Sequence, residues 1–131
     1  MSDPESPVSA WLRKAEHDVL NIENNLAAKE IPWDTICFHA QQAAEKLLKA
    51  FLIAQGQDIQ RTHDLVAILS ECVKISPGLA HLENDCRNLT YFAVSGRYPD
   101  DVFEPEEQDG RNMVEALHRL RSILLPLLTN R

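Results

Sequence analysis

The sequence is poor in the residues on which β-rich folds depend. Its 131 residues include only four Gly, and 6% of them are aromatic. A β-sandwich or barrel needs many turns and many aromatic or β-branched strand residues. No apolar run approaches the roughly 20 residues of a membrane-spanning helix. The composition therefore weighs against an all-β fold and against a membrane protein.

Cysteine is also scarce. The three thiols, an odd number, belong to Cys37, Cys72 and Cys86, and no two of them have CxxC or other metal-ligand spacing. We expect no disulfide framework, no metal site and no cofactor, since a phosphate-cradling glycine loop is missing too. The thiols are interpreted as small hydrophobic residues on buried helix faces in a reducing cytosol. The N-terminus has neither the basic nor the apolar region of a signal peptide, so a cytoplasmic location is predicted.

The charge balance is acidic, with 13 Lys and Arg against 20 Asp and Glu, a net charge of −7. This sum opposes a broad surface for nucleic acid or anionic membrane, but it leaves room for a local basic cleft. The length and the 44% hydrophobic content suit one globular domain. We assign residues 9–129 to that domain and residues 1–8 to a polar N-terminal tail.

Apolar residues recur at intervals of three and four in five segments, which is the pattern of amphipathic helices. The expected helices cover about residues 9–28, Pro32 or Asp34 to about Gln55, Thr62 or His63 to the break at Ser76, about 79–89, and Pro105 onward. Residues 92–105 are predicted to form a long loop, and Pro126 is predicted to kink or end the last helix.

These segments predict an all-α fold, an up-and-down bundle of four main helices plus one short helix. The second helix has a broad apolar face rich in alanine, which lets neighbouring helices approach closely. We therefore expect it at the centre of the bundle.

Three short signatures follow one another in the order seen in a known family. They are residues 38–49 (FHAQQAAEKLLK), then, after Gly56, residues 62–65 (THDL), and finally residues 96–100 (GRYPD). In this order and spacing they resemble the HEPN domain family of prokaryotes, over about residues 11–128. The resemblance implies a helical bundle, usually a homodimer, often encoded beside a small nucleotidyltransferase with which it forms a toxin and antitoxin pair. Many members are metal-independent ribonucleases, and others are regarded as inactive nucleotide-binding or scaffolding modules.

The resemblance also implies where a ribonuclease site would lie. The family's motif is an Arg, commonly followed by a polar residue, then four to six residues and a His, near the start of the last helix. Arg111, Asn112 and His118 fit this form at its loose end, with six residues between Arg111 and His118. Positions seven apart share one helix face, about 10.5 Å apart along the axis. His118 would be the general base or acid, Arg111 would hold the phosphate, and Asn112 would orient either partner.

Other observations oppose catalysis. Arg and His seven apart also occur by chance as solvated residues, with Arg111 paired to Glu115. Acidic residues crowd the stretch from Asp100 to Glu107 and would repel RNA, whose binding draws on phosphate neutralisation. Residues 97–100 (RYPD) mark a family branch in which the ribonuclease motif is often degraded. A dimer that gathered basic residues from both chains would overcome the repulsion; those residues are Arg97, Arg111, Arg119 and Arg121.

A second candidate site combines His63 and Asp64 with Arg97 and Tyr98. If the segment with Arg97 and Tyr98 folds over the start of the third helix, Arg97 would grip a phosphate and Tyr98 would stack on a base. The alternative, which we favour, is that residues 62–64 cap the helix. Tyr98 would then be a buried core residue.

A polar stripe follows one side of the second helix at steps of three and four. Its members are His39, Gln42, Lys46 and Lys49. The stripe would line a groove or a dimer seam, or it would be a solvated face, which is the favoured interpretation. Glu45 and Lys49 form a helix-stabilising pair in the favourable orientation.

Three functions follow from these patterns. The first is a homodimeric module associated with nucleotide or RNA and paired with a minimal nucleotidyltransferase. The second is a metal-independent endoribonuclease that uses Arg111 and His118. The third is a purely structural dimerisation module, for which no nucleotide would shift the melting temperature.

Overall fold

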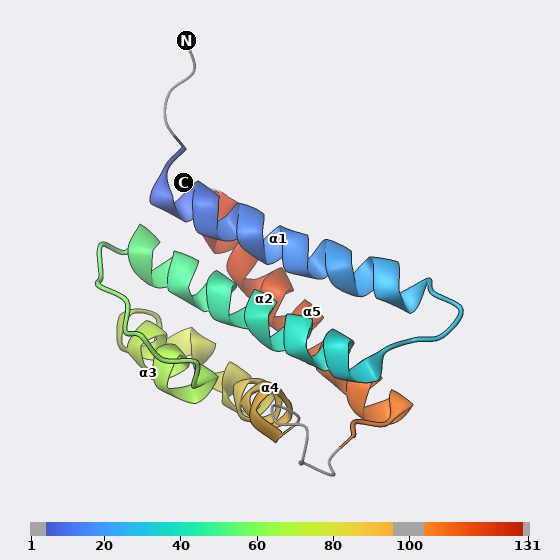
Figure 1. Cartoon of the computed structure of the whole chain (residues 1–131). Helices are drawn as coiled ribbons and strands as arrows, with labels where there is room; N and C mark the ends of the chain where they lie inside the picture. The colour runs from blue at the N-terminus through green and yellow to red at the C-terminus, as the bar shows by residue number, and fades with distance from the viewer. Residues whose placement is uncertain (1–4, 96–103, 130–131) are drawn as a thin grey trace.

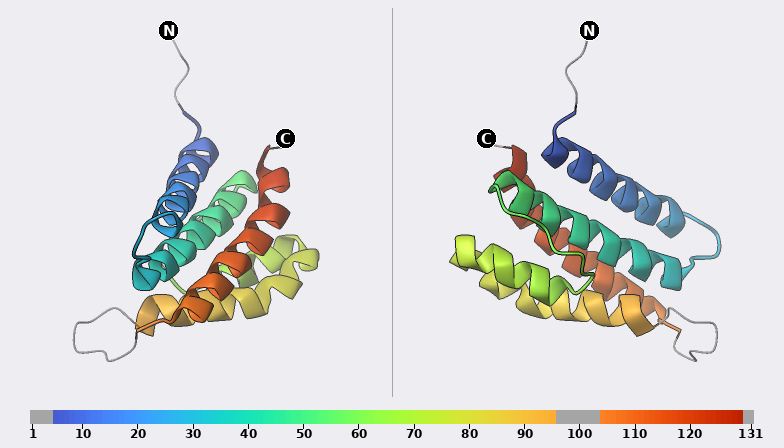
Figure 2. Two further views of the ribbon diagram at one scale, coloured as in Figure 1. Left: turned by 90° about the vertical axis from the view of Figure 1, so that its right-hand side faces the viewer. Right: turned by 60° about the vertical axis from the view of Figure 1, so that its left-hand side comes forward.

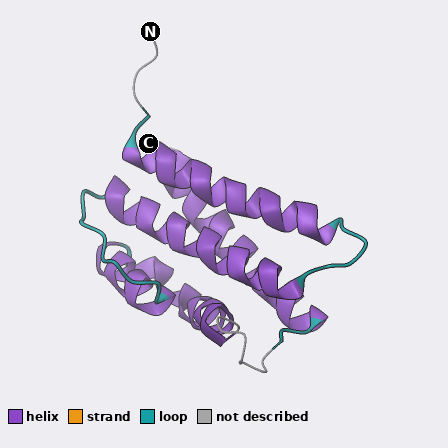
Figure 3. Cartoon of the chain, in the orientation of Figure 1, coloured by secondary structure: helices purple, strands orange, loops and turns teal. Residues whose placement is uncertain are grey.

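The computed structural model describes residues 5–95 and 104–129, and every regular element within these ranges is a helix (Figure 3). The elements are α1 (Pro7–Leu26), α2 (Trp33–Ala54), α3 (Leu65–Ile75), the 3₁₀ helix η1 (Pro77–Leu82), α4 (Glu83–Ser95) and α5 (Glu107–Thr129). The all-α prediction is confirmed. The packed bundle has five α-helices, of which α3 is the shortest with 11 residues.

Helix α2 lies at the centre of the bundle, as predicted. It packs against α1, α3, α4 and α5. In Figure 1 α1 runs alongside α2 and α5 crosses behind it, while α3 and α4 cover the opposite side; Figure 2 shows the same arrangement from two other directions. Thirteen of the 22 residues of α2 are buried, so the helix is enclosed on most of its circumference.

The core is one continuous cluster to which all the α-helices contribute. Small residues of α2 such as Ala40, Ala43 and Ala44 are fully buried, which allows the close approach expected of them. The three cysteines are free and buried, as predicted. Burial raises the pKa of each thiol to about 12, so the thiols stay protonated at neutral pH and are poor nucleophiles.

The structure shows how the helices begin in the first half of the chain, and Pro32 is the N-cap of α2, one of the two predicted starts. Helix α1 begins at Pro7, two residues before the predicted Ser9, because the Ser6 hydroxyl accepts a hydrogen bond from Ser9 N. Helix α3 begins after Asp64, whose carboxylate accepts from Val66 N and Ala67 N. The favoured prediction that residues 62–64 cap the helix is confirmed at Asp64, but the expected start at Thr62 or His63 is not where α3 begins. The stop at Gly56 is confirmed by its φ of 74°.

In the second half of the chain, the structure corrects three further predicted boundaries. Helix α4 continues to Ser95, so the predicted loop does not begin at Phe92, because the helix breakers of this stretch start only at Gly96. Helix α5 begins after Pro105, where Asp109 Oδ2 accepts a hydrogen bond from Glu106 N. Pro126 does not end α5, which continues to Thr129, because a proline so close to the helix end disturbs only the last turn.

Candidate functional site

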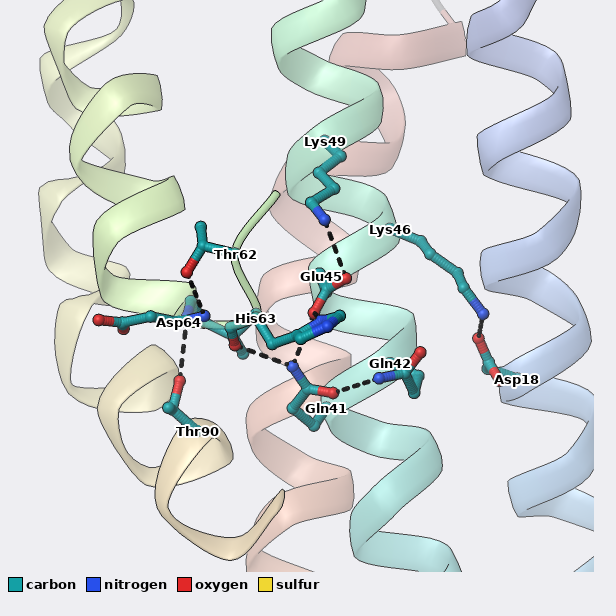
Figure 4. A network of polar contacts seen from close by, with 11 residues as sticks. Asp18, Gln41, Gln42, Glu45, Lys46, Lys49, Thr62, His63, Asp64 and Thr90 are labelled. Atoms are coloured by element: carbon teal, nitrogen blue, oxygen red, sulfur yellow. Dashed lines mark hydrogen bonds and ion pairs between the residues drawn. The ribbon is translucent and has the colours of Figure 1, made fainter. Parts of the chain in front are cut away.

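A network of polar side chains surrounds Glu45 of α2, where α2 faces the segment before α3 (Figure 4). Glu45 is 4% exposed. Its Oε1 accepts a hydrogen bond from Gln41 Nε2 at 3.0 Å and lies 2.8 Å from His63 Nδ1. Its Oε2 accepts from Lys49 Nζ at 3.0 Å. We call Gln41, Glu45, Lys49 and His63 the Glu45 cluster.

The Glu45 cluster keeps its carboxylate ionised. Burial raises the pKa of Glu45, but the hydrogen bonds from His63, Gln41 and Lys49, together with the charge of Lys49, outweigh burial and hold the pKa below its ordinary value. An ionised carboxylate only accepts hydrogen bonds. His63 Nδ1 must therefore carry a proton and donate it to Glu45 Oε1.

The backbone around His63 is fixed as firmly as its ring. Gln41 Nε2 donates to the His63 carbonyl oxygen at 3.1 Å. On the other side, Asp64 N donates to Thr62 Oγ1, and Leu65 N donates to Thr90 Oγ1 of α4. The His63 side chain nevertheless keeps 66% of its surface exposed. The structure thus presents a held but accessible imidazole at the start of α3.

The polar stripe on α2 is largely covered, and its interpretation as a solvated face was wrong. Lys49 is 6% exposed, and its ammonium lies 5.8 Å from the centroid of the Trp11 ring. Asp18 of α1, 7% exposed, contacts His39 Nδ1 at 2.8 Å and Lys46 Nζ at 2.6 Å. Residues from other segments therefore enclose a stripe that looks exposed in isolation. The predicted pair of Glu45 and Lys49 is confirmed.

Sequence reasoning missed the anchoring roles of Asp18, Gln41 and Glu45. The available signal was a carboxylate inside an apolar face: Asp18 lies between Ala15, Val19 and Ile22, all of which are buried. A charged residue in such a position is rarely buried unless it is paired. Its partners, however, come from another helix, 21 and 28 positions away.

Arg111, Asn112 and His118 are all exposed on the outer side of α5, as their helical spacing predicts. Arg111 donates two hydrogen bonds to Glu107 Oε1, at 3.1 and 2.9 Å, and its guanidinium lies 5.1 Å from the centroid of the Trp33 ring. Its ion-pair partner is thus Glu107, one turn earlier, in place of the Glu115 considered from sequence. Asn112 Oδ1 accepts from Gln108 Nε2.

The start of α5 is held against α2 by a close contact between Gly110 and Trp33. A Cβ atom added to Gly110 would lie 2.3 Å from Trp33 Cε3, too close for any side chain. Two of the arginines expected to gather in a dimer cleft pair within the chain. Arg119 binds Asp85 of α4, and Arg121 binds Glu16 of α1, each through two hydrogen bonds.

Arg97 and Tyr98 lie outside the described residues. In residues 5–95 and 104–129, no group of three His, Cys, Asp or Glu side chains is arranged to hold a metal ion. None of the described helices is long and apolar enough to cross a membrane.

Comparison with known proteins gives three matches. A family model described as the HEPN domain matches residues 8–127. The crystal structure of an archaeal HEPN homologue superposes with a TM-score of 0.73 at 21% identity, covering 95% of this chain and 100% of that chain. The crystal structure of a protein from Thermus thermophilus gives a TM-score of 0.67 at 27% identity, covering 92% of this chain and 95% of that chain. No curated protein matches the chain.

Proposed function

The chain belongs to the HEPN domain family, and from this premise we propose that it is a homodimeric module that binds a nucleotide beside His63 and acts with a minimal nucleotidyltransferase. The observation that carries the proposal is the His63 imidazole, which is exposed to solvent while its Nδ1 is held by the buried Glu45. A phosphate is the ligand group that such an imidazole suits, because the protonated ring donates a charge-assisted hydrogen bond.

The first turn of α3 adds little to this site by itself. The Asp64 carboxylate already accepts from Val66 N and Ala67 N, and Leu65 N is bonded to Thr90 Oγ1. The amides that often bind phosphate at a helix N-terminus are thus occupied. Recognition of the phosphate falls to side chains, His63 first among them.

Arg97 and Tyr98 complete the proposed site on the strength of the sequence. Thr90 of α4 is bonded to the start of α3, and α4 ends at Ser95, about 7.5 Å further along the helix axis. Helix α4, which carries Thr90, therefore leads from the start of α3 toward the part of the sequence that holds Arg97 and Tyr98. In this proposal Arg97 holds a phosphate and Tyr98 stacks on the base.

The homodimer is supported by apolar side chains left on the outside of the bundle. Ile123 and Leu127, four residues apart on α5, are 38% and 45% exposed, and Phe38 of α2 is 50% exposed. Apolar residues of this size favour burial in an interface. Sedimentation equilibrium is expected to give twice the chain mass, and a monomer at micromolar concentration would remove this part of the proposal.

Nucleotide binding is tested directly by calorimetric titration with ribonucleoside mono-, di- and triphosphates. The wild type is expected to bind at least one of them, and the His63→Ala and Arg97→Ala variants are expected to bind it at least about tenfold more weakly. His81→Ala is the matched control, because His81 is also exposed but lies in η1, bonded to the Gly78 carbonyl. The absence of binding by the wild type, with no shift of its melting temperature, would reject a nucleotide site.

A ribonuclease is the second candidate, favoured by the shared exposure of Arg111, Asn112 and His118 on one side of α5. In this function His118 moves a proton and Arg111 leaves Glu107 to hold the scissile phosphate. Cleavage of cellular RNA in the presence of a chelator, by the wild type and not by His118→Ala, would establish it. If neither protein cleaves RNA at high concentration, the ribonuclease is rejected and the binding module remains.

A further inference from the structure

The Glu45 cluster supports a side chain that stays in solvent. The Glu45 side chain is 6% exposed and that of Lys49 is 7% exposed, whereas that of His63 is 66% exposed. Burying a carboxylate is costly and is offset only by good partners. Lys49 and Gln41 already supply a charge and a hydrogen bond. If the contact between Glu45 and His63 served only to stabilise the fold, a buried imidazole would stabilise it most. The His63 imidazole is accessible.

The amide of Gln41 shows how the cluster is oriented. Its Nε2 faces two oxygens that only accept hydrogen bonds, Glu45 Oε1 and the carbonyl of His63. Its Oε1 accepts from Gln42 Nε2 at 2.7 Å. The amide therefore has one consistent orientation. Through Gln41 and Glu45, α2 holds both the backbone and the ring of His63.

We propose that Glu45 is a positioning residue, which fixes His63 in the form protonated at Nδ1 and so presents Nε2 to a phosphate of the nucleotide. The ligand part of this inference rests on the function proposed above, but the positioning part does not. With Nδ1 bonded to Glu45, only Nε2 is available to a ligand. When the ring carries a second proton, Nε2–H donates a charge-assisted hydrogen bond to a phosphate oxygen.

The variant that tests this inference replaces the buried pair together. Glu45→Leu alone would leave Lys49 buried without a counter-charge. The double variant Glu45→Leu/Lys49→Met removes both charges and substitutes apolar side chains of similar size, which proteins often accept at little cost. The matched control is Asp18→Leu/Lys46→Met, which removes the carboxylate and lysine pair between α1 and α2 without touching His63.

The first measurement needs no ligand. Nitrogen and carbon chemical shifts of the imidazole rings report which nitrogen carries the proton, and the signal of His63 among the five histidines is assigned by its loss in His63→Gln. The wild type and the control variant are expected to show His63 protonated at Nδ1. The Glu45→Leu/Lys49→Met variant is expected to show the ring protonated largely at Nε2 or as a mixture.

The second measurement is a double-mutant cycle on nucleotide affinity. Glu45→Leu/Lys49→Met is expected to weaken binding about tenfold, but to change it less than about twofold when His63 is already alanine. If Glu45 acts only through His63, its replacement cannot weaken binding further in the His63→Ala variant, which has no imidazole. Additive losses would mean that the cluster supports the fold in general, and the positioning role would be rejected.

The two proposals fail separately. A neutral wild-type ring protonated at Nε2 alone, or a tautomer that does not respond to Glu45→Leu/Lys49→Met, overturns the positioning role whether or not a nucleotide binds. If the tautomer responds as expected but no nucleotide binds, the proposed function and the assigned ligand are overturned, and Glu45 positions an imidazole for something else.

Discussion

His63 and Arg111, the residues proposed to bind a phosphate at the two candidate sites, are held in different ways. His63 is bonded to residues 18 and 22 positions earlier in the chain, and its carboxylate partner is buried. Arg111 is bonded to Glu107, four positions earlier in the same helix, and the Glu107 side chain is 63% exposed. The first arrangement exists only in the complete fold, whereas the second needs only one turn of helix. Tertiary contacts therefore fix the geometry at His63, and Arg111 remains free to exchange partners.

The sharpest test of this difference is to remove the carboxylate at each place. Glu45→Ala is expected to lower the free energy of unfolding by about 3–5 kcal/mol, because it leaves the buried Lys49 without a counter-charge. Glu107→Ala is expected to change it by no more than about 1 kcal/mol, because exposed ion pairs contribute little. Urea unfolding followed by circular dichroism measures both. Equal losses of unfolding free energy in the two variants would contradict the difference between the two sites.

The second test concerns the long-range contact at the start of α5. Gly110→Ala places a Cβ against the Trp33 ring and is expected to destabilise the fold by about 1–3 kcal/mol, the usual cost of overpacking. Gly78→Ala is the control, because a Cβ there meets nothing within 4 Å. Thermal unfolding of the two variants measures the difference. If Gly110→Ala is as stable as Gly78→Ala, α5 does not depend on Trp33.

The third test uses acid. The pKa of Glu45 is lowered in the folded protein, so its contribution to stability is complete above the ordinary pKa of about 4.5 and is lost as pH falls through the lowered value. Unfolding free energies measured from pH 7 to pH 3 are expected to fall less steeply in Glu45→Leu/Lys49→Met than in the wild type. Parallel curves would show that the loss of stability in acid arises from groups other than Glu45.

The smallest effect is expected at Arg111. Arg111→Ala removes an exposed ion pair and a stacking contact with Trp33, which together contribute about 1 kcal/mol or less. A double-mutant cycle with Glu107→Ala, read by urea unfolding, should give a coupling below about 0.5 kcal/mol. A larger coupling would mean that Arg111 is fixed as firmly as His63.

The sequence predicted those features that depend on neighbours within one helix. Apolar spacing located the helices and the central place of α2, and spacing alone put Arg111 and His118 on the same side of α5. The pair of Glu45 and Lys49, four residues apart, was also found. Each of these features follows from the 3.6-residue period of the helix.

The features that sequence did not predict depend on what covers a helix. Lys49 was read as solvated because nothing near it in sequence covers it; Trp11, whose ring lies close to its ammonium, comes from α1. The path of the segment between α2 and α3 has no periodic pattern from which to infer it. The start of α3 was assigned to Thr62 or His63 because Thr62 and Asp64 are both good N-cap types and no periodic pattern distinguishes them.

The enclosure of α2 also controls the hydrogen exchange of its backbone amides. A helix buried on most sides and packed against four others opens only when the whole domain opens. Gln41, Glu45 and Lys49 project from this helix, so the groups that hold His63 are expected to open only with the whole domain. The supporting carboxylate and amide are therefore in place before any ligand arrives, and binding at His63 does not have to order them.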